Sequence, residues 1–258
     1  MTIALLRSMR TSYLSWIPVL LLTGCGMTTR NEAATTGTTT ASTPSSGASG
    51  RAAVAMTMKT HARLGKVLRD ALVRGDLATA KDRASELAHL RFEPESTDWN
   101  QHAEVMNAAA ATVVQARGVA AMARSIAALA AACGDCHAAH EGPSPGTSSP
   151  GEPDAGVAAA MLRHEWAVTR LWDGLATPSD EAWAAGAEVL ADPALAPELL
   201  TPGKTPVPRV GALAEAIHMH GLAAKNATSV AARRDVYAQT LASCVDCHNW
   251  LGGGPESH

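Results

Sequence analysis

Apolar side chains recur at spacings of three and four residues along most of this chain, the pattern of an α-helix with one buried face. In the first such stripe the repeating positions are Met58, His61, Gly65, Leu68 and Leu72. No stretch shows the strict apolar–polar alternation of a half-buried β-strand. The pattern therefore predicts an all-α protein.

The residues between 52 and 140 divide into four expected helices. Gly75 ends the first helix and Asp76 can cap the second. Pro94 breaks the chain, and Ser96 or Thr97 caps the third helix. Gly118 separates the third helix from the fourth. Four helices joined by short loops predict an antiparallel bundle. The positions that mark the second, third and fourth helices are Ala80, Ala84, Leu87 and Leu90, then Trp99, His102, Met106, Ala109 and Val113, then Met122, Ile126, Leu129 and Cys133.

A Pro/Gly/Ser-rich linker covers residues 141–156, and the same plan then repeats over 157–251, with 252–258 as a tail. Thr177 is predicted to cap a second helix that has Pro178 at its first position. A Pro-rich loop separates that helix from the third. The positions that mark the four helices are Met161, His164, Val168, Leu171 and Leu175, then Glu181 to Leu190, then Val210, Leu213, Ile217 and Leu222, then Ser229 through Val236, Tyr237, Leu241 and Cys244.

The two groups of helices match each other in unusual features, which indicates an internal duplication. The pair Met58 and His61 recurs as Met161 and His164, 103 residues further on. Each group also ends in a Cys-x-x-Cys-His pattern, and these two patterns lie 111 residues apart. The extra length of the second group fits its Pro-rich loop. The sequence thus predicts two tandem four-helix bundles with the same special residues.

The Cys-x-x-Cys-His pattern is typical of c-type haem attachment. On a helix the two cysteines and the histidine share one face, so both thiols can bond the haem vinyl groups while the imidazole binds the iron. A zinc half-site would need turns around each pair, and a thioredoxin-like dithiol would accompany a βαβ pattern, and neither is present. Two covalently bound haem c groups are expected, one on Cys133, Cys136 and His137 and the other on Cys244, Cys247 and His248.

A four-helix bundle with Cys-x-x-Cys-His near the end of its last helix resembles the cytochrome c-prime family and its low-spin relatives. The resemblance covers both groups of helices, although this chain differs from the usual family by carrying two bundles in tandem. It implies that a Met early in the first helix is the sixth iron ligand, and Met58 and Met161 match that position. His61 and His164 are the alternative ligands. An open iron, as in the gas-binding high-spin members, is the third possibility.

These features predict an electron carrier rather than an enzyme, working with redox partner proteins. A thioether ligand raises the haem potential and leaves no free coordination position, which suits electron transfer. Tandem haems form a short relay if their edges approach closely. A dihaem peroxidase-like catalyst and a gas-binding haem module are the alternatives, and both require an open distal side on the iron.

The first 24 residues are predicted to be an export signal. Arg7 and Arg10 precede an apolar run from Tyr13 to Leu22, which is too short to span a bilayer as a stable helix. Leu22 to Cys25 then resembles the lipobox of bacterial lipoproteins, which implies cleavage before Cys25 and a lipid on its thiol. An ordinary signal peptide with a free Cys25 is the alternative. Five cysteines fit one lipid and two haems with none left over.

A lipid on Cys25 would hold the protein at the periplasmic side of a bacterial membrane through acyl chains alone. By resemblance to enterobacterial sorting, Gly26 after that cysteine favours the outer membrane. Residues 25–51 are rich in Thr, Ser and Gly, so they are predicted to form a flexible tether.

The composition adds two constraints. Hydrophobic residues make up 47% of the chain, but with one Phe and two Tyr there are few large side chains to fill a core, so two haems would supply apolar volume. The net charge is −3, and removing a leader that holds two arginines and no acidic residue makes it −5. This balance argues against a nucleic-acid surface.

Other polar and aromatic residues are given ordinary structural roles. The basic face of the first helix is expected to be solvated, four histidines to be exposed, and four tryptophans to pack in the cores, with haem contact open to Trp166. The basic residues are Lys59, Arg63, Lys66, Arg69 and Arg74. The histidines are His102, His140, His218 and His220, and the tryptophans are Trp99, Trp166, Trp172 and Trp183.

Overall fold

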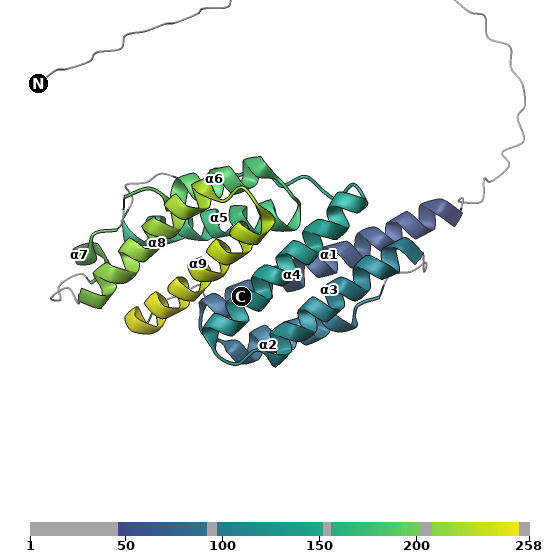
Figure 1. Ribbon diagram of the computed structural model, residues 1–258, viewed down its shortest axis with the longest axis horizontal. Helices are drawn as coiled ribbons and strands as arrows, with labels where there is room; N and C mark the ends of the chain where they lie inside the picture. The colour runs from purple at the N-terminus through teal and green to yellow at the C-terminus, as the bar shows by residue number, and fades with distance from the viewer. Residues whose placement is uncertain (1–45, 92–96, 152–155, 194, 202–207, 253–258) are drawn as a thin grey trace, which may run out of the picture. The chain divides into compact units, whose positions relative to one another are not determined.

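The computed structural model describes residues 46–91, 97–151, 156–193, 195–201 and 208–252. This part of the chain is all-α, with nine helices and no strand (Figure 1). It belongs to a compact unit, Pro44–His258. The predicted leader, Cys25, most of the tether and residues 253–258 of the tail lie outside the described residues. The helices are α1 (Ser46–Val73), α2 (Leu77–His89), α3 (Thr97–Gln115), α4 (Val119–Ala139), α5 (Val157–Ala176), α6 (Asp180–Leu190), α7 (Pro197–Leu200), α8 (Pro208–Asn226) and α9 (Val230–Leu251).

The helices pack in two sets that follow the chain order. In the first half, α1 to α4, each helix packs against the next one along the chain. In the second half, α5 to α9, α5 packs against α6, α6 against α8 and α8 against α9, while the short α7 contacts α8. The halves meet where α4 packs against α9 and α5, and where α1 packs against α9 (Figure 1). This packing is consistent with helical bundles.

The buried faces of the helices agree with most of the predicted stripes. Two predictions shift: α3 buries Ala110 more fully than the predicted Ala109, and α8 exposes the predicted Leu222 while it buries Gly221 and Ala224. An Ala-rich helix gives several equivalent faces, so the pattern alone could not fix the register there. The predicted positions that are buried include Leu68, Leu72, Ala80, Ala84, Leu87, Met106, Val113, Met122, Ile126, Leu129, Val168, Leu171, Leu175, Val210, Leu213, Ile217, Tyr237 and Leu241.

Within the described residues, α4 is the one helix long and apolar enough to cross a membrane by length and composition. Its Met122, Ile126 and Leu129 are almost completely buried among neighbouring helices. It packs against α3, α5 and α9. In this fold α4 is therefore a core helix, and its apolar character follows from being covered on several sides.

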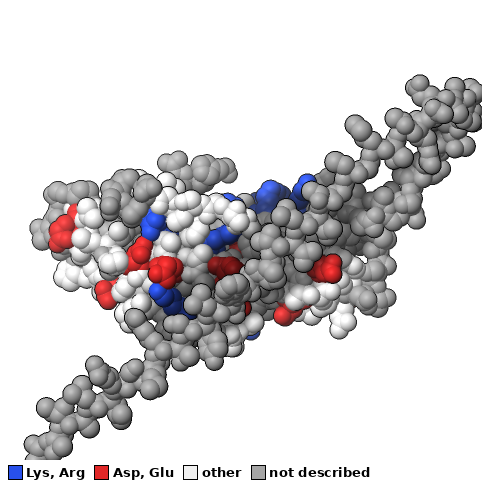
Figure 2. Space-filling view, turned by 90° about the horizontal axis from the view of Figure 1, so that it is seen from above, with Lys and Arg blue, Asp and Glu red and all other residues white. Residues whose placement is uncertain are grey.

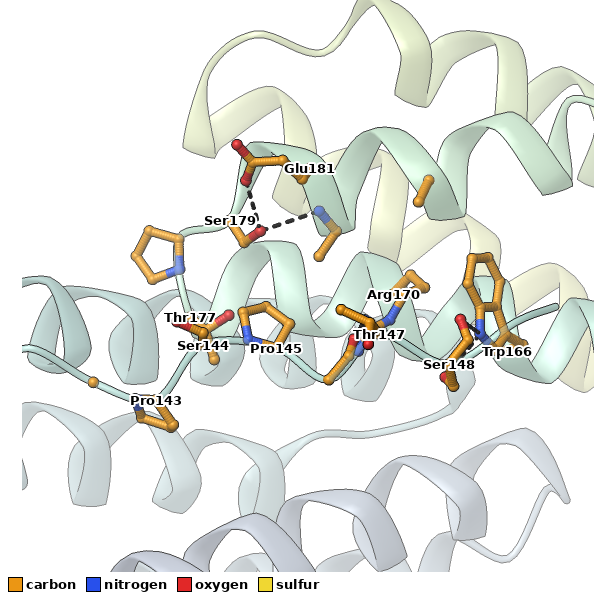
Figure 3. A pocket seen from close by; sticks show the side chains of 15 residues that line it. Pro143, Ser144, Pro145, Thr147, Ser148, Trp166, Arg170, Thr177, Ser179 and Glu181 are labelled. Atoms are coloured by element: carbon orange, nitrogen blue, oxygen red, sulfur yellow. Dashed lines mark hydrogen bonds between the residues drawn. The ribbon is translucent and has the colours of Figure 1, made fainter. Parts of the chain in front are cut away.

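Two helix starts differ from the prediction. Helix α1 begins at Ser46 rather than Ala52, inside the segment expected to be tether. Helix α6 is capped by Ser179, whose hydroxyl accepts a hydrogen bond from the Ala182 N–H (Figure 3). The predicted cap, Thr177, instead ends α5, because its hydroxyl donates to the Asp173 carbonyl one turn back.

The predicted linker 141–156 is fastened along α5 in its first part rather than standing free (Figure 3). The Arg170 guanidinium donates to the Gly146 carbonyl, and the Trp166 indole N–H donates to the Ser148 carbonyl at 3.0 Å. These two side chains lie one turn apart on the same face of α5, so they hold this part of the linker against the helix. Trp166 is half-buried and packs against the core as expected, and its indole N–H also holds the linker.

Charged side chains of both signs alternate over the face shown in Figure 2. Among the described residues, ion pairs also join different elements of the fold, as expected of a surface of mixed charge. Such exposed pairs contribute little stability individually. They include Lys66 with Glu165, Arg163 with Asp192, and Lys225 with Glu188.

Candidate functional site

The last two turns of α9 line a cavity of about 660 Å³. We call it the second cavity because it lies at the second Cys-x-x-Cys-His motif. Cys244, Cys247 and His248 all line it, as their spacing on one helix face predicts. Met161 and His164 of α5 line the same cavity. Cavities of this size, mostly apolar with a few polar groups, are typical of cofactor sites. The structure therefore brings together the five residues that the sequence assigned to the second site.

Helix α1 of the first half also reaches this cavity. Val73, the last residue of α1, lines it together with Arg69 and Asp70. The remaining apolar wall includes Leu213 and Ile217 of α8. The second site is thus built from both halves of the chain, which the sequence pattern did not predict.

A hydrogen bond fixes the orientation of His248. Its Nδ1 lies 3.1 Å from the Val73 carbonyl oxygen. A carbonyl oxygen only accepts, so Nδ1 carries the proton and donates. Nε2 is then the nitrogen with a lone pair for a metal, which is the arrangement usual for metal-bound histidines.

The motif of the first half has the same arrangement. His137 of α4 is half-buried, and its Nδ1 lies 2.5 Å from the carbonyl oxygen of Ala176, the last residue of α5. By the same reasoning Nδ1 donates and Nε2 is left for a metal. Cys136 is buried and Cys133 is half-buried on the same helix.

In both halves the histidine early in the first helix lies in the electrostatic reach of the motif histidine. His61 is 8% exposed, and burial together with nearby His137 lowers its pKa to about 4. Burial, Arg163 and His248 likewise lower the pKa of His164 to about 4. Both imidazoles are therefore neutral at neutral pH. Neutral imidazoles near the motif histidines are competent to bind a metal.

Met58 lies one turn before His61 and is half-buried. In the second half the equivalent Met161 lines the cavity together with His164. The structure thus brings both predicted candidates for the sixth iron position to the second site. The optical spectrum of the oxidised protein distinguishes a methionine from a histidine in that position.

The four motif cysteines are free thiols in an apolar setting. Burial raises the pKa of Cys133 and of Cys244 to about 12, and burial also raises the pKa of Cys136 and Cys247. Reactive dithiols have the opposite shift, because the thiolate is the nucleophile. Among the described residues no group of three or more His, Cys, Asp or Glu could hold a metal ion by itself. This part of the chain does not join the two Cys pairs into one metal centre.

The residues fit a haem group. On one wall of the second cavity stand two neutral thiols, able to form neutral thioethers, and an imidazole with Nε2 available. The thioether of Met161 and the imidazole of His164 line the same cavity. The apolar lining suits a porphyrin face.

The two candidate sites lie at opposite ends of α5. Met161 and His164, near its start, line the second cavity, and Ala176, at its end, contacts His137. At 1.5 Å per residue, Met161 and Ala176 are about 22 Å apart along the helix axis. The residues that α5 contributes to the two sites are therefore separated by most of the length of that helix.

Arg69 is a buried residue that the sequence analysis placed on a solvated face. It is 2% exposed and pairs with Asp70 at 2.9 Å. Tyr237 of α9, completely buried, packs beside the pair. The signal was present in the sequence: Arg69 follows Gly65 by four residues and so falls at the edge of the buried stripe.

Four histidines expected to be exposed are instead half-buried and engaged. His140 stacks on Trp99, with ring centroids 4.2 Å apart, and His102 packs edge-on against it. His218 contacts the Asp192 carbonyl and His220 the Ser243 hydroxyl. Trp183, in contrast, is a core residue as predicted.

No family model, no curated protein and no solved structure matches this chain. Its function is therefore inferred from its residues and their geometry.

Proposed function

We propose that this protein is a dihaem c-type electron-transfer protein, built as two tandem four-helix bundles of the cytochrome c-prime type. The observation that carries the proposal is the second cavity, whose mostly apolar lining includes Cys244, Cys247 and His248 together with Met161 and His164. The duplicated motif Cys133–His137 extends the proposal to a second haem. Nδ1 of His137 contacts a backbone carbonyl, as Nδ1 of His248 does.

In each site the chain holds, orients and shields the haem, which supplies a one-electron Fe(III)/Fe(II) couple. The two cysteines hold the group covalently, so it is retained when the potential changes. The motif histidine presents Nε2 to the iron because its Nδ1–H is engaged by a carbonyl. The apolar walls exclude water and tune the potential. These are the requirements of an electron carrier rather than of an enzyme.

The location follows from the leader. Cleavage before Cys25 and a lipid on its thiol would hold the protein at the periplasmic side of a bacterial membrane, the outer membrane being favoured by Gly26. Redox partner proteins would then exchange electrons with the two haem sites. The mixed charge of the visible face gives no reason to expect nucleic acid (Figure 2).

The deciding experiment is a redox titration of the mature protein with visible spectroscopy. Two reversible one-electron steps are expected, together with a mass gain equal to two haem groups under denaturing conditions. A chain exported and matured in a host competent for haem attachment, yet lacking Soret absorption, would contradict the proposal. Fast peroxide turnover with a reduced donor would instead favour a peroxidase.

The sixth ligand is tested by two variants of the second site. We expect Met161→Leu to remove part of the Met–iron charge-transfer band of the oxidised protein and to lower one midpoint potential, because a thioether ligand raises the potential. His164→Leu is the matched control, since His164 lies one turn away and lines the same cavity. Retention of the band in Met161→Leu and a change of axial ligation in His164→Leu would assign the position to the histidine.

A further inference from the structure

The two motif histidines contact opposite halves of the chain. His137 belongs to the first half, but its hydrogen-bond acceptor, Ala176, ends the first helix of the second half. His248 belongs to the second half, but its acceptor, Val73, ends the first helix of the first half. We propose that the two halves complete each other's iron sites, the carbonyls of Ala176 and Val73 being the positioning groups for His137 and His248.

The internal duplication supports this crossing. Val73 and Ala176 lie 103 residues apart, the same spacing that relates Met58 to Met161. The two acceptors therefore occupy the same place in the two repeats. An accidental contact would have no reason to recur at equivalent positions on both sides.

The chemistry of a helix end explains why these carbonyls are used. The last carbonyls of an α-helix lack a donor within the helix and lie at the negative end of its dipole. At the end of α1 the N–H groups of Arg74, Gly75 and Asp76 bond to the carbonyls of Asp70, Leu72 and Ala71. The Val73 carbonyl accepts from the imidazole of His248. Such an acceptor strengthens the imidazole as an iron donor and so favours the oxidised iron.

A glycine stands at each contact, one where close packing requires it and one where a positive φ favours it. A Cβ on Gly134, inside the motif of α4, would lie 2.2 Å from the Leu175 carbonyl oxygen. At the other contact Gly75 has φ +78°, and a Cβ there would lie 2.8 Å from Oδ1 of Asn249, the residue after His248. Both glycines allow a helix end of one half to reach the motif of the other.

Consequently each first helix serves two sites. Helix α5 carries Met161 and His164 at its own cavity and Ala176 at the other site. Helix α1 carries His61 near His137 and Val73 at the second cavity. Neither half by itself contains all the groups that orient its histidine.

The first test uses the wild-type protein, so it does not depend on a variant that folds. In NMR spectra of the reduced holoprotein we expect slowly exchanging Nδ1 protons on His137 and His248, with cross-peaks to protons at Ala176–Thr177 and Val73–Arg74. Rapid exchange with solvent, or cross-peaks confined to the histidine's own half, would overturn the proposal. The inference deepens the proposed function, and the same cross-peaks can be sought in the chain without haem. Failure of haem attachment would therefore be distinguished from failure of the crossing.

The second test is Gly134→Ala, in which the new methyl group must displace the end of α5 from α4. With both haems attached by mass, we expect the midpoint potential of the first haem to rise and that of the second to stay unchanged. Gly146→Ala is the matched control, because a Cβ there meets nothing within 4 Å. A loss of stability without a selective shift of one potential would reduce the contact to ordinary packing and refute the positioning role.

Discussion

Replacing Cys244 and Cys247 together with alanine is expected to leave one haem on the chain instead of two. These two thiols lie on the wall of the second cavity, so their loss removes both covalent attachments at that site only. The mass gain under denaturing conditions and the Soret absorbance per chain should both fall by about one half, since the proposal assigns one of two haems to each pair.

The matched variant is the replacement of Cys133 and Cys136, which should remove the other haem and leave the second site loaded. In the Cys244/Cys247 variant the cavity of about 660 Å³ loses the group proposed to fill it. The contacts of α8 and α9 should then weaken, and hydrogen exchange should accelerate there first. An unchanged mass in either variant would contradict the assignment of its cysteines.

The second large effect is expected from Asp70→Ala, which leaves the buried Arg69 without its carboxylate. Arg69 is 2% exposed, and removal of one partner of a buried ion pair costs about 3–5 kcal/mol. Urea denaturation at neutral pH measures the change. Lys66→Ala is the surface control: Lys66 also pairs with Asp70, but its side chain is 59% exposed, so only a small change is expected. A small loss in both variants would show that Arg69 is satisfied by other groups.

The same carboxylate makes a testable contribution to acid stability. Burial favours its neutral form, but Arg69 and Lys66 outweigh this and lower the pKa of Asp70 below its usual value of 3.8. A group whose pKa is lower in the folded state contributes stability above its unfolded pKa and loses it as the pH falls through its folded pKa. The difference between wild type and Asp70→Asn should therefore be full at neutral pH and shrink below about pH 4. A difference that stays constant down to pH 2 would be inconsistent with this linkage.

The helix pattern was readable from the sequence because its signals are local. Stripes with a period near 3.6, together with Gly75 and Gly118 between them, mark the helices of the first half, and all of them are present. The motif histidines and the candidate ligands early in the first helices could be named from the sequence because the duplication repeats them. That Met161 and His164 lie at the same cavity as Cys244–His248 follows from one feature of a four-helix bundle. Its first and last helices run antiparallel, so the start of the first lies near the end of the last.

Contacts between distant elements were not readable in the same way. The hydrogen bond of His137 to Ala176 is made by a backbone carbonyl, which has no sequence signature. The role of Gly134 was hidden because the two middle positions of the motif are variable by definition. The fastening of the linker by Arg170 and Trp166 also escaped, since its Pro/Gly/Ser composition is the same for a free segment and for one held on a helix.

The reciprocal contacts of His137 and His248 have the form of an isologous interface, in which two copies use the same pair of surfaces on each other. Here each repeat offers its motif histidine to the end of the other repeat's first helix. Two separate subunits joined in this way would come apart on dilution, and their stability would depend on concentration. With both copies in one polypeptide the association becomes intramolecular, at an effective concentration set by the connecting segment. The connection thus fixes the stoichiometry at one partner each, so one chain makes both contacts without a second copy.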